Sequence, residues 1–149
     1  MSRLTNYTLR AMVQQDFIFY QNLHKDSLKP YVEQVWGWID SQQEKRLKER
    51  FSPSKMQVIQ VCNQDVGVLE IEKTSEGVFL KNILILPKFQ GRGLGSQIIR
   101  DVIEEAILLP VFLSVLRPNP AKKLYKRLGF KVVSEEPERF YMKRDSESA

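Results

Sequence analysis

Hydrophobic positions change their spacing along the 149 residues of the chain, and these changes mark the expected helices and strands. Residues 7–13 predict a first strand, and residues 17–23 predict a helix that Asp16 caps. Pro30 suits the first turn of a second helix, in which apolar residues recur every three or four positions. Acids and bases alternate over residues 42–50, which indicates a solvated helical face.

Apolar residues then follow a period of two, which is typical of strands. Residues 56–62 and 66–71 predict a hairpin with its turn at 63–65, and residues 75–77 turn the chain again. The next strand, 78–86, ends in a continuous Ile-Leu-Ile-Leu run. A run of this kind is expected of a strand that is covered on both faces.

A helical period returns near Gly93, where a long amphipathic helix is predicted to begin. The remaining predicted elements are strands at 111–116, 130–133 and 140–143, and a helix at 121–128 that Asn119 and Pro120 start and Gly129 ends. Helices thus alternate with the strands of a central sheet. We therefore predict an α/β fold in one domain, residues 1–149, with its core at about 7–143.

Composition and charge narrow the class of protein. The chain is 42% hydrophobic and 28% charged, as globular domains are. Its 23 Lys and Arg against 18 Asp and Glu leave a net charge of +5, which favours an anionic partner without identifying it. The basic residues are spread along the chain, with no recognition helix and no stripe of aromatic and basic residues. We therefore do not expect a nucleic-acid-binding protein.

Cysteine usage and hydropathy favour a cytoplasmic protein. With one cysteine, Cys62, and one histidine, the chain cannot form an internal disulfide or a Cys/His zinc site. We interpret Cys62 as a buried thiol in an apolar strand. The first residues lack the apolar run of an export signal. The most apolar stretch, 106–116, is shorter than the ~20 residues that a membrane helix needs, so no membrane association is expected.

The most informative segment is the glycine-rich loop Gln-Gly-Arg-Gly-Leu-Gly-Ser at residues 90–96, between a buried strand and a helix. Glycines allow unusual dihedral angles and close approach, and successive amides at a helix N-terminus bind phosphate oxygens. The loop lacks the Gly-Lys-Ser/Thr ending of a Walker loop and the G-x-G-x-x-G spacing of a Rossmann fold. Glycines that only permit tight packing are an alternative explanation.

Residues 85–95 resemble motif A of the GCN5-related N-acetyltransferases, the GNAT superfamily, whose core is Gln/Arg-x-x-Gly-x-Gly/Ala. Gln90, Gly93 and Gly95 occupy its defining positions. A second family motif resembles residues 119–125, Asn-Pro-Ala-Lys-Lys-Leu-Tyr, followed by Leu-Gly-Phe at 128–130. The two motifs have the family's order and separation, and the resemblance extends over about residues 7–143.

The resemblance implies a mixed sheet of about seven strands flanked by about four helices. Acetyl-coenzyme A (acetyl-CoA) would lie between two central parallel strands that splay apart, without a metal. Loop amides would hold the pyrophosphate, and strand backbone would pair with the pantetheine arm. The implied cofactor-binding residues are Ile83, Leu84, Ile85, Gln90, Gly91, Arg92, Gly93, Leu94, Gly95, Ser96, Asn119 and Lys122.

Transfer of an acetyl group to an amine needs an acid and a base. By the family's tyrosine position, Tyr125 is the candidate general acid, because a phenol stays protonated at neutral pH. Its helical spacing alone favours a core residue beside Leu124 and Leu128, and the match to the family's tyrosine position reverses that preference. Glu70 and Glu72 share one strand face and are candidates for the base, although two charges on a solvated sheet face are an equal alternative.

The candidate acceptor-binding residues lie on the predicted N-terminal helices. They are His24, Tyr31, Trp36 and Trp38. The two tryptophans would lie about 200° apart on one helix, so only one of them would face inward. The imidazole of His24 has an ordinary pKa near neutrality, but an incidental position is an alternative.

We therefore expect an N-acetyltransferase that moves the acetyl group of acetyl-CoA to a primary amine by direct attack in a ternary complex. The acceptor would be a small-molecule or peptide amine. An alternative from another class is a non-catalytic acyl-CoA-binding sensor or scaffold. A monomer and a homodimer are both compatible with the sequence.

Overall fold

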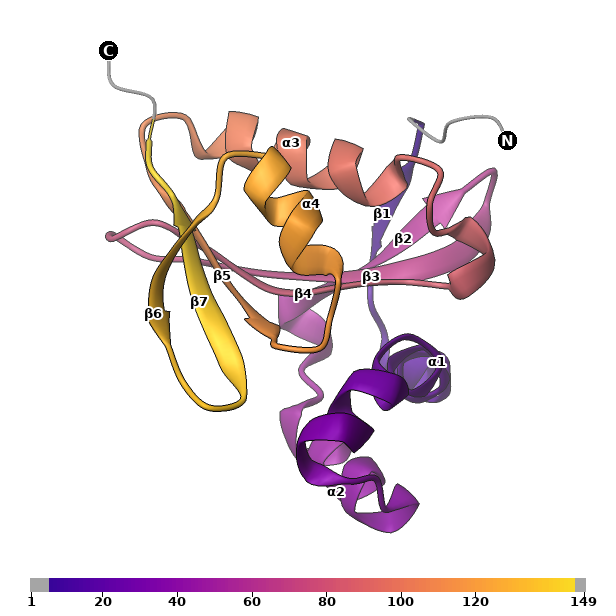
Figure 1. Cartoon of the computed structure of the whole chain (residues 1–149). Helices are drawn as coiled ribbons and strands as arrows, with labels where there is room; N and C mark the ends of the chain where they lie inside the picture. The colour runs from indigo at the N-terminus through magenta and orange to yellow at the C-terminus, as the bar shows by residue number, and fades with distance from the viewer. Residues whose placement is uncertain (1–5, 147–149) are drawn as a thin grey trace.

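The computed structural model describes residues 6–146 and contains a seven-stranded sheet in the order β1-β2-β3-β4-β5-β7-β6 (Figure 1). All neighbouring strands are antiparallel except β4 and β5, which are parallel. The strands are β1 (Thr8–Ala11), β2 (Met56–Val61), β3 (Gln64–Lys73), β4 (Val78–Ile85), β5 (Val111–Leu116), β6 (Lys131–Glu135) and β7 (Arg139–Arg144). The expected α/β class and seven-stranded mixed sheet are confirmed.

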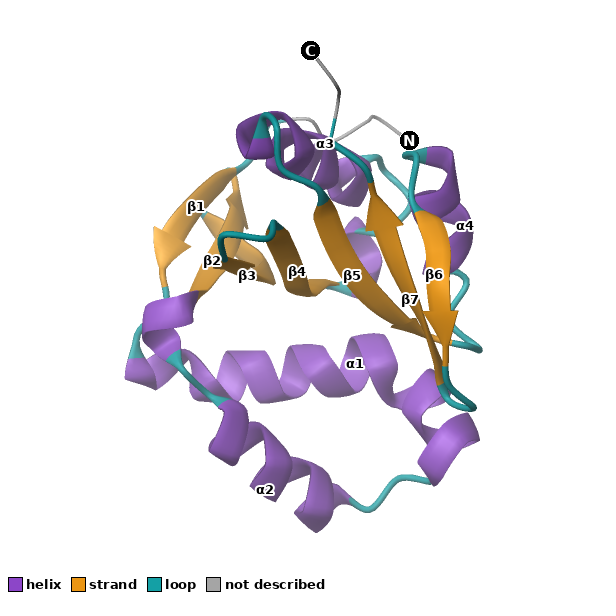
Figure 2. Cartoon of the chain, turned by 90° about the vertical axis from the view of Figure 1, so that its left-hand side faces the viewer, coloured by secondary structure: helices purple, strands orange, loops and turns teal. Residues whose placement is uncertain are grey.

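Four helices cover the two faces of this sheet, α3 and α4 on one face and α1 and α2 on the other (Figures 1 and 2). The helices are α1 (Phe17–Trp36), α2 (Asp40–Arg50), α3 (Leu94–Ala106) and α4 (Ala121–Arg127), with short 3-10 turns η1 (Gln14–Asp16), η2 (Pro53–Lys55) and η3 (Pro87–Phe89). The amphipathic helix expected near Gly93 thus begins at Leu94. The helix expected after Asn119 and Pro120 begins at Ala121.

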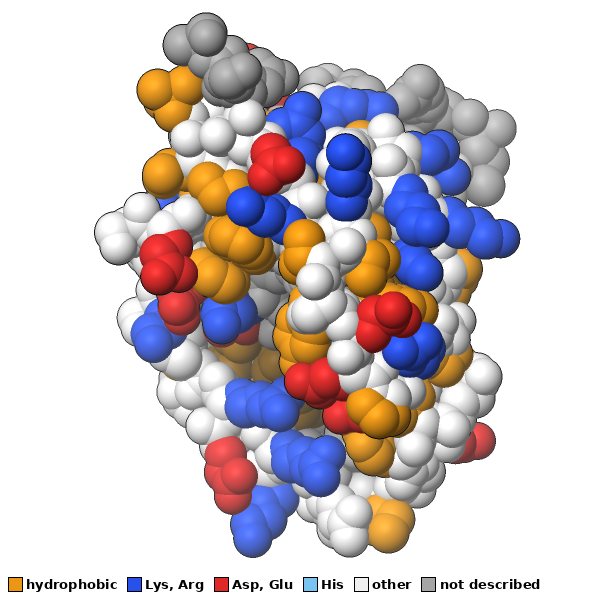
Figure 3. Space-filling model, turned by 60° about the vertical axis from the view of Figure 1, so that its left-hand side comes forward, with side chains coloured by type: hydrophobic (Ala, Val, Ile, Leu, Met, Phe, Trp, Pro, Cys, Tyr) orange, Lys and Arg blue, Asp and Glu red, His pale blue; other side chains and the backbone are white. Residues whose placement is uncertain are grey.

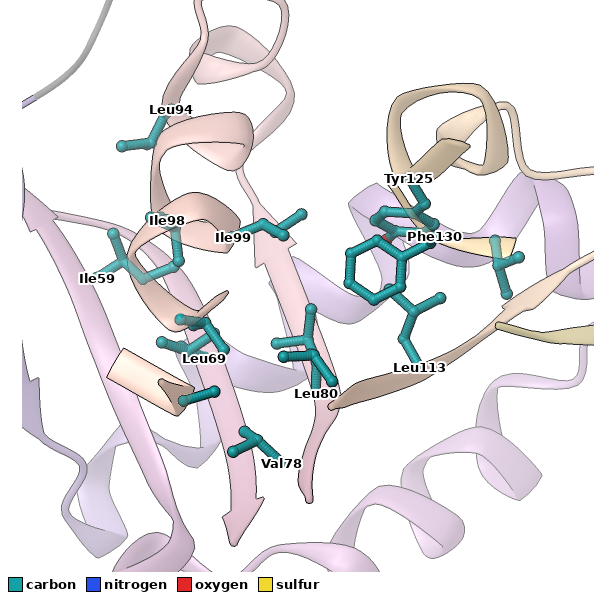
Figure 4. Close-up of a cluster of buried hydrophobic side chains, with 14 of the residues drawn as sticks. Ile59, Leu69, Val78, Leu80, Leu94, Ile98, Ile99, Leu113, Tyr125 and Phe130 are labelled. Atoms are coloured by element: carbon teal, nitrogen blue, oxygen red, sulfur yellow. The ribbon is translucent and has the colours of Figure 1, made fainter. Parts of the chain in front are cut away.

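Each face of the sheet has its own apolar core. On the α3 side, Leu94, Ile98 and Ile99 of α3 pack onto strand residues such as Leu69 and Leu80 (Figure 4). On the α1 side, Tyr20 and Leu23 of α1 and Leu47 of α2 pack onto a second group of strand residues. Burial of one such side chain stabilises the fold by roughly 1.5–3 kcal/mol. Since β4 contributes to both cores, its continuous apolar run is covered on both faces, as predicted.

A β-bulge bends β4 in the middle of the sheet. Glu70 of β3 pairs with Asn82, but the next residue, Ile71, pairs with Leu80, so Lys81 is an extra residue in β4. Bulges of this kind interrupt the ladder and bend the strand. Before the bulge, β4 pairs with β5 at two positions, Val78 with Val111 and Phe79 with Phe112. The two strands then separate, and we call the space between them the β4–β5 split.

The N-terminal helix differs from the sequence prediction. Instead of a new helix starting at Pro30, one helix, α1, runs through this residue to Trp36. An internal proline costs a helix ~3 kcal/mol through its missing amide and its ring. Burial of Leu23 before it and of Val32 after it helps to offset that cost. Gly37, with φ of +79°, ends the helix, so Trp36 and Trp38 do not share a helix and that prediction was wrong.

The hairpin between β2 and β3 also differs from its prediction. Val61 pairs with Gln64, which leaves a two-residue turn of Cys62 and Asn63, not a turn at 63–65. Both turn residues have positive φ, 51° and 63°, as a tight hairpin turn of the I′ type requires. Cys62 is therefore exposed, and its interpretation as a buried thiol was wrong.

The first five residues, where the absence of an export signal was predicted, lie outside the described residues. Within residues 6–146, no helix is both long enough and apolar enough to cross a bilayer.

Helix α1 carries the only histidine of the chain, and its side chain is partly buried. His24 lies against Tyr20 and Trp38, with ring centroids 6.3 and 6.1 Å from its own. Its buried Nδ1 atom has no hydrogen-bond partner within the described residues. Burial, and secondarily the positive charge of Arg50, lowers the pKa of His24 to about 4. The imidazole is therefore neutral at pH 7 in the folded protein.

This depressed pKa predicts a pH-dependent stability. The imidazole takes up its proton near pH 6.5 in the unfolded chain and near pH 4 in the folded chain. The unfolding free energy is therefore unaffected by this group above pH 6.5, and it falls as the pH drops from 6.5 to 4. We expect the wild-type protein to lose about 2 kcal/mol more unfolding free energy than His24→Gln between about pH 7 and pH 4.5. Denaturant unfolding at both pH values measures this difference. Equal losses in the two proteins would contradict the buried neutral imidazole.

Candidate active site

A cleft of about 950 Å³ opens at the β4–β5 split. Its lining combines Tyr20 of α1 and Leu47 of α2, which belong to the core on one face of the sheet, with Tyr125 of α4, which belongs to the core on the other. The cleft therefore connects the two faces through the split. In space-filling representation, a hollow with hydrophobic side chains at its floor lies among Lys, Arg, Asp and Glu side chains (Figure 3).

Backbone groups of β4 point into the split. The amide of Leu86 donates to the carbonyl of Val66 at 2.8 Å, so the antiparallel ladder directs Leu86 and, by alternation, Leu84 toward β3. Ile83 and Ile85 then direct their amides and carbonyls to the other side. Consistently, the Ile85 carbonyl accepts hydrogen bonds from outside the ladder, from Gln90 Nε2 at 2.8 Å and from Ser27 Oγ at 3.2 Å.

The glycine-rich loop places free helix amides next to this strand. Gly91 and Gly93 have φ of +71° and +84°, a conformation that favours glycine, and Gly93 directly precedes α3. The amides of Leu94, Gly95 and Ser96 form the first turn of α3 and have no partner within the helix. Such amides, at the positive end of the helix dipole, bind phosphate oxygens.

The space beside two of the loop glycines is not filled by protein. A Cβ atom added to Gly91 would meet nothing within 4 Å, and one added to Gly95 would meet only Ile85 Cδ1, at 3.5 Å. Tight internal packing therefore does not explain these two glycines. The open cradle and its amides fit the pyrophosphate of a coenzyme.

Two of the predicted positive side chains belong to the loop region, and a third lies on α4. Lys88 precedes the loop, with its Nζ 5.3 Å from the ring centroid of Phe89, and Arg92 lies between two loop glycines. Lys122, in the first turn of α4, has its Nζ only 3.6 Å from the ring centroid of Phe140. This cation–π contact holds the Lys122 ammonium on the β7 side of α4.

The second motif positions α4 against the split. The N-cap position of α4 is Pro120, one residue later than predicted, but the side-chain Oδ1 of Asn119 still accepts the amide hydrogen of Ala121, the first helical residue, at 2.9 Å. Asn119 also lines the cleft. At the other end of the helix, Gly129 adopts φ of +96° and turns the chain into β6.

Tyr125 of α4 lines the cleft and belongs to the apolar core on the α3 side of the sheet. Its ring packs edge-on against Phe130, with centroids 6.1 Å apart, and both rings lie above Leu113 (Figure 4). The residue is 8% exposed, and this burial raises the pKa of Tyr125 to about 12. Its hydroxyl has no hydrogen-bond partner within residues 6–146. The phenol is thus a buried, protonated donor in the wall of the cleft.

Both candidate bases line the cleft from β3. Glu70 is partly buried, and its Oε1 accepts a hydrogen bond from Asn82 Nδ2 at 2.7 Å. Glu72 is exposed. The bulge lies in β4 and not in this part of β3, so the two carboxylates keep a common face.

The structure separates the predicted acceptor residues into two pairs. His24 and the half-exposed Trp36 line the cleft, whereas Tyr31 and Trp38 are not among its lining residues. Trp38 instead packs on His24 and donates its Nε1 hydrogen to Asp40 Oδ1 at 2.7 Å.

Sequence reasoning missed a group of basic residues in the cleft. Arg46 and Arg50 of α2 lie one turn apart, and Lys55 follows in η2. The only sequence signal for the two arginines was the charged helix at 42–50, which is equally typical of a solvated surface, and Lys55 lies outside that segment.

Metal-ligating side chains do not gather in the described part of the chain. Among residues 6–146, no three or more His, Cys, Asp or Glu side chains are grouped so that they could hold a metal ion.

The fold has counterparts in known structures. The PaiA N-acetyltransferase from Thermoplasma acidophilum, in complex with coenzyme A, has a TM-score of 0.72 at 16% identity, over 94% of this chain and 99% of its own. The acetyltransferase from Thermus thermophilus has a TM-score of 0.70 at 20% identity, over 97% and 99% of the two chains. The ribosomal-protein-S18-alanine N-acetyltransferase from Escherichia coli has a TM-score of 0.67 at 16% identity, over 97% of each chain.

These similarities establish the fold, and the family is established by the sequence. No match was found among curated protein sequences. The family described as acetyltransferase (GNAT) domain matches residues 52–132, which is more than half of the chain and includes the glycine-rich loop and Tyr125. The chain therefore belongs to the GNAT family of acetyltransferases.

Proposed function

We propose that this protein is an acetyl-CoA-dependent N-acetyltransferase that acts on a primary amine by direct transfer in a ternary complex. The observation that carries the proposal is the continuous cleft through the β4–β5 split. It extends from Tyr125, on the face of the sheet that also carries the glycine-rich loop, to a charged cavity on the other face. Acetyl-CoA would supply an acetyl group activated as a thioester.

The residues that would hold acetyl-CoA follow from the geometry of the cradle and the split. The amides of Leu94, Gly95 and Ser96 would bind the pyrophosphate, assisted by the loop and by Lys88. The backbone of Ile83 and Ile85 would pair with the amide groups of the pantetheine arm. Asn119 would contact the arm from the opposite wall, as an acceptor or a donor of hydrogen bonds.

The strand amides would also polarise the acetyl carbonyl. An amide hydrogen of Ile83 or Ile85 aimed at the carbonyl oxygen would stabilise negative charge without any side chain. Holding the amine and the thioester in register would supply much of the remaining acceleration. The chain needs no metal for this chemistry.

Tyr125 would act as the acid by donating its hydrogen to the departing sulfur. With a pKa of about 12, the phenol keeps its proton at neutral pH. The thiolate of an ordinary thiol, whose pKa is near 8.5, is a weaker base than the phenolate of Tyr125, so complete proton transfer to it would be unfavourable. The burial that raises the pKa of Tyr125 also raises that of a thiol held beside it, which brings the two groups closer in acidity.

Glu70 and Glu72 would accept the proton of the amine, directly or through a water molecule. Both lie on the acceptor side of the split, and Asn82 orients Glu70 by its 2.7 Å hydrogen bond. His24, with its imidazole neutral at pH 7, and Trp36 would form the opposite wall.

The first prediction separates cofactor binding from folding at Gly95. The family motif accepts Gly or Ala here, and an alanine Cβ would make only an ordinary contact with Ile85. The branched side chain of valine would enter the cradle. We expect acetyl-CoA to raise the melting temperature of the wild-type protein and of Gly95→Ala, and to leave Gly95→Val unshifted.

The control for this prediction is circular dichroism, which should be the same in all three proteins without ligand. Absence of a shift in the wild-type protein at saturating acetyl-CoA would contradict the proposed function.

The second prediction concerns Tyr125→Phe, which keeps the packed ring and removes only the hydroxyl. Because this hydroxyl has no protein partner among the described residues, the melting temperature should change little. If the hydroxyl is the acid, kcat should fall by about 10²–10⁴-fold while the affinity for acetyl-CoA stays within a few-fold. Thiol release under single-turnover conditions measures the chemical step apart from product release.

An unchanged single-turnover rate would leave Tyr125 as a core residue and assign proton donation to water. Binding of acetyl-CoA without thiol release for any amine would instead support a non-catalytic acyl-CoA sensor.

A further inference from the structure

The acceptor side of the cleft carries an excess of positive charge. Its lining contains five cationic side chains, Arg46, Arg50, Lys55, Lys81 and Arg139, and three carboxylates, Glu49, Glu70 and Glu72. None of these eight groups forms a salt bridge with any residue of the described chain, 6–146. The cleft thus presents both signs of charge to a ligand, with cations in the majority.

The opposite charges are arranged around one aromatic residue. Tyr20 lies at the α1 wall, and both Glu70 of β3 and Arg50 of α2 act on it electrostatically, in opposite directions. Arg50 also acts on His24, one helical turn from Tyr20. The carboxylate on the sheet and the guanidinium on the helix therefore flank the same part of the cavity.

The basic residues on α2 are not placed to serve the cofactor. The glycine-rich loop and α3 lie on one face of the sheet, and α2 lies on the other (Figure 2). Arg46 and Arg50 line the cleft on that second face. Since a guanidinium binds a carboxylate through two parallel hydrogen bonds, these side chains suit an anionic group of the acceptor.

Building on the proposed function, we propose that the acceptor is a primary amine that also carries an anionic group, such as a carboxylate. Its amine lies toward Glu70 and Glu72 at the split, and its anionic group lies toward Arg46 and Arg50. A diamine would place its second ammonium group against these arginines, so polyamines are poor acceptors.

The test uses amines of equal chain length that differ only at the far end. At the far end, 6-aminohexanoate carries a carboxylate, hexylamine a methyl group and 1,6-diaminohexane an ammonium group. Shorter sets of the same three kinds vary the distance between the amine and the far group. The dipeptides Ala-Glu and Ala-Lys extend the comparison to peptide amines. The readouts are kcat/KM from thiol release and the equilibrium affinity of each amine for the protein–coenzyme A complex by calorimetry.

We expect the carboxylate-bearing amine to exceed the methyl-ended amine by about tenfold or more in both readouts, and the diamine to be the weakest. Arg46→Gln/Arg50→Gln should remove most of that advantage, so that the ratio of the carboxylate-bearing to the methyl-ended amine falls toward one in both readouts. Lys48→Gln is the matched control, because Lys48 lies on the same helix, outside the cleft lining, and pairs with Glu44 at 3.1 Å. It should behave as wild type.

Equal or stronger binding of the diamine, or a carboxylate advantage that survives the double substitution, would overturn the inference. Failure of the proposed function is recognised separately, because it abolishes thiol release with every amine. Even then, the calorimetric order of the three amines supports or refutes the charge preference of the cleft.

Discussion

The interrupted pairing between β4 and β5 is the constraint on which the site depends. In the middle of a sheet, an unpaired buried backbone group costs about 1–3 kcal/mol. Here the extra residue at Lys81 bends β4, and pairing with β5 ends after Phe79. The backbone of Ile83 and Ile85 therefore needs partners from outside the sheet, and Gln90 and Ser27 supply them only at the Ile85 carbonyl.

The same interruption brings together candidate functional groups from the two faces of the sheet. The loop amides of α3 and the phenol of Tyr125 belong to the α3 side, whereas Glu70, His24 and the arginines of α2 belong to the α1 side. A continuous ladder would separate these groups completely. Because the sheet opens here, a group bound along β4 reaches both, which is what transfer between two substrates requires.

The parts of this arrangement that depend on local sequence could be predicted. The glycine loop, the helix after it and the hydrogen bond from the Ala121 amide to Asn119 each follow from a short-range rule. The continuation of α1 through Pro30 and the turn at Cys62 could not be predicted, because tertiary packing and strand register override local preference there. The basic lining from α2 was missed for a related reason: a charged helical face has the same sequence pattern against solvent and against a cleft.

Amide hydrogen exchange with and without coenzyme A, measured by NMR, tests the central role of the split most directly. At saturating ligand, the amides of Ile83 and Ile85 should exchange about tenfold or more slowly, since the arm supplies their missing partner. The amide of Leu84, which faces β3, should change little and is the internal control. Unchanged exchange at both isoleucines, with the ligand bound, would show that the split is not where the coenzyme lies.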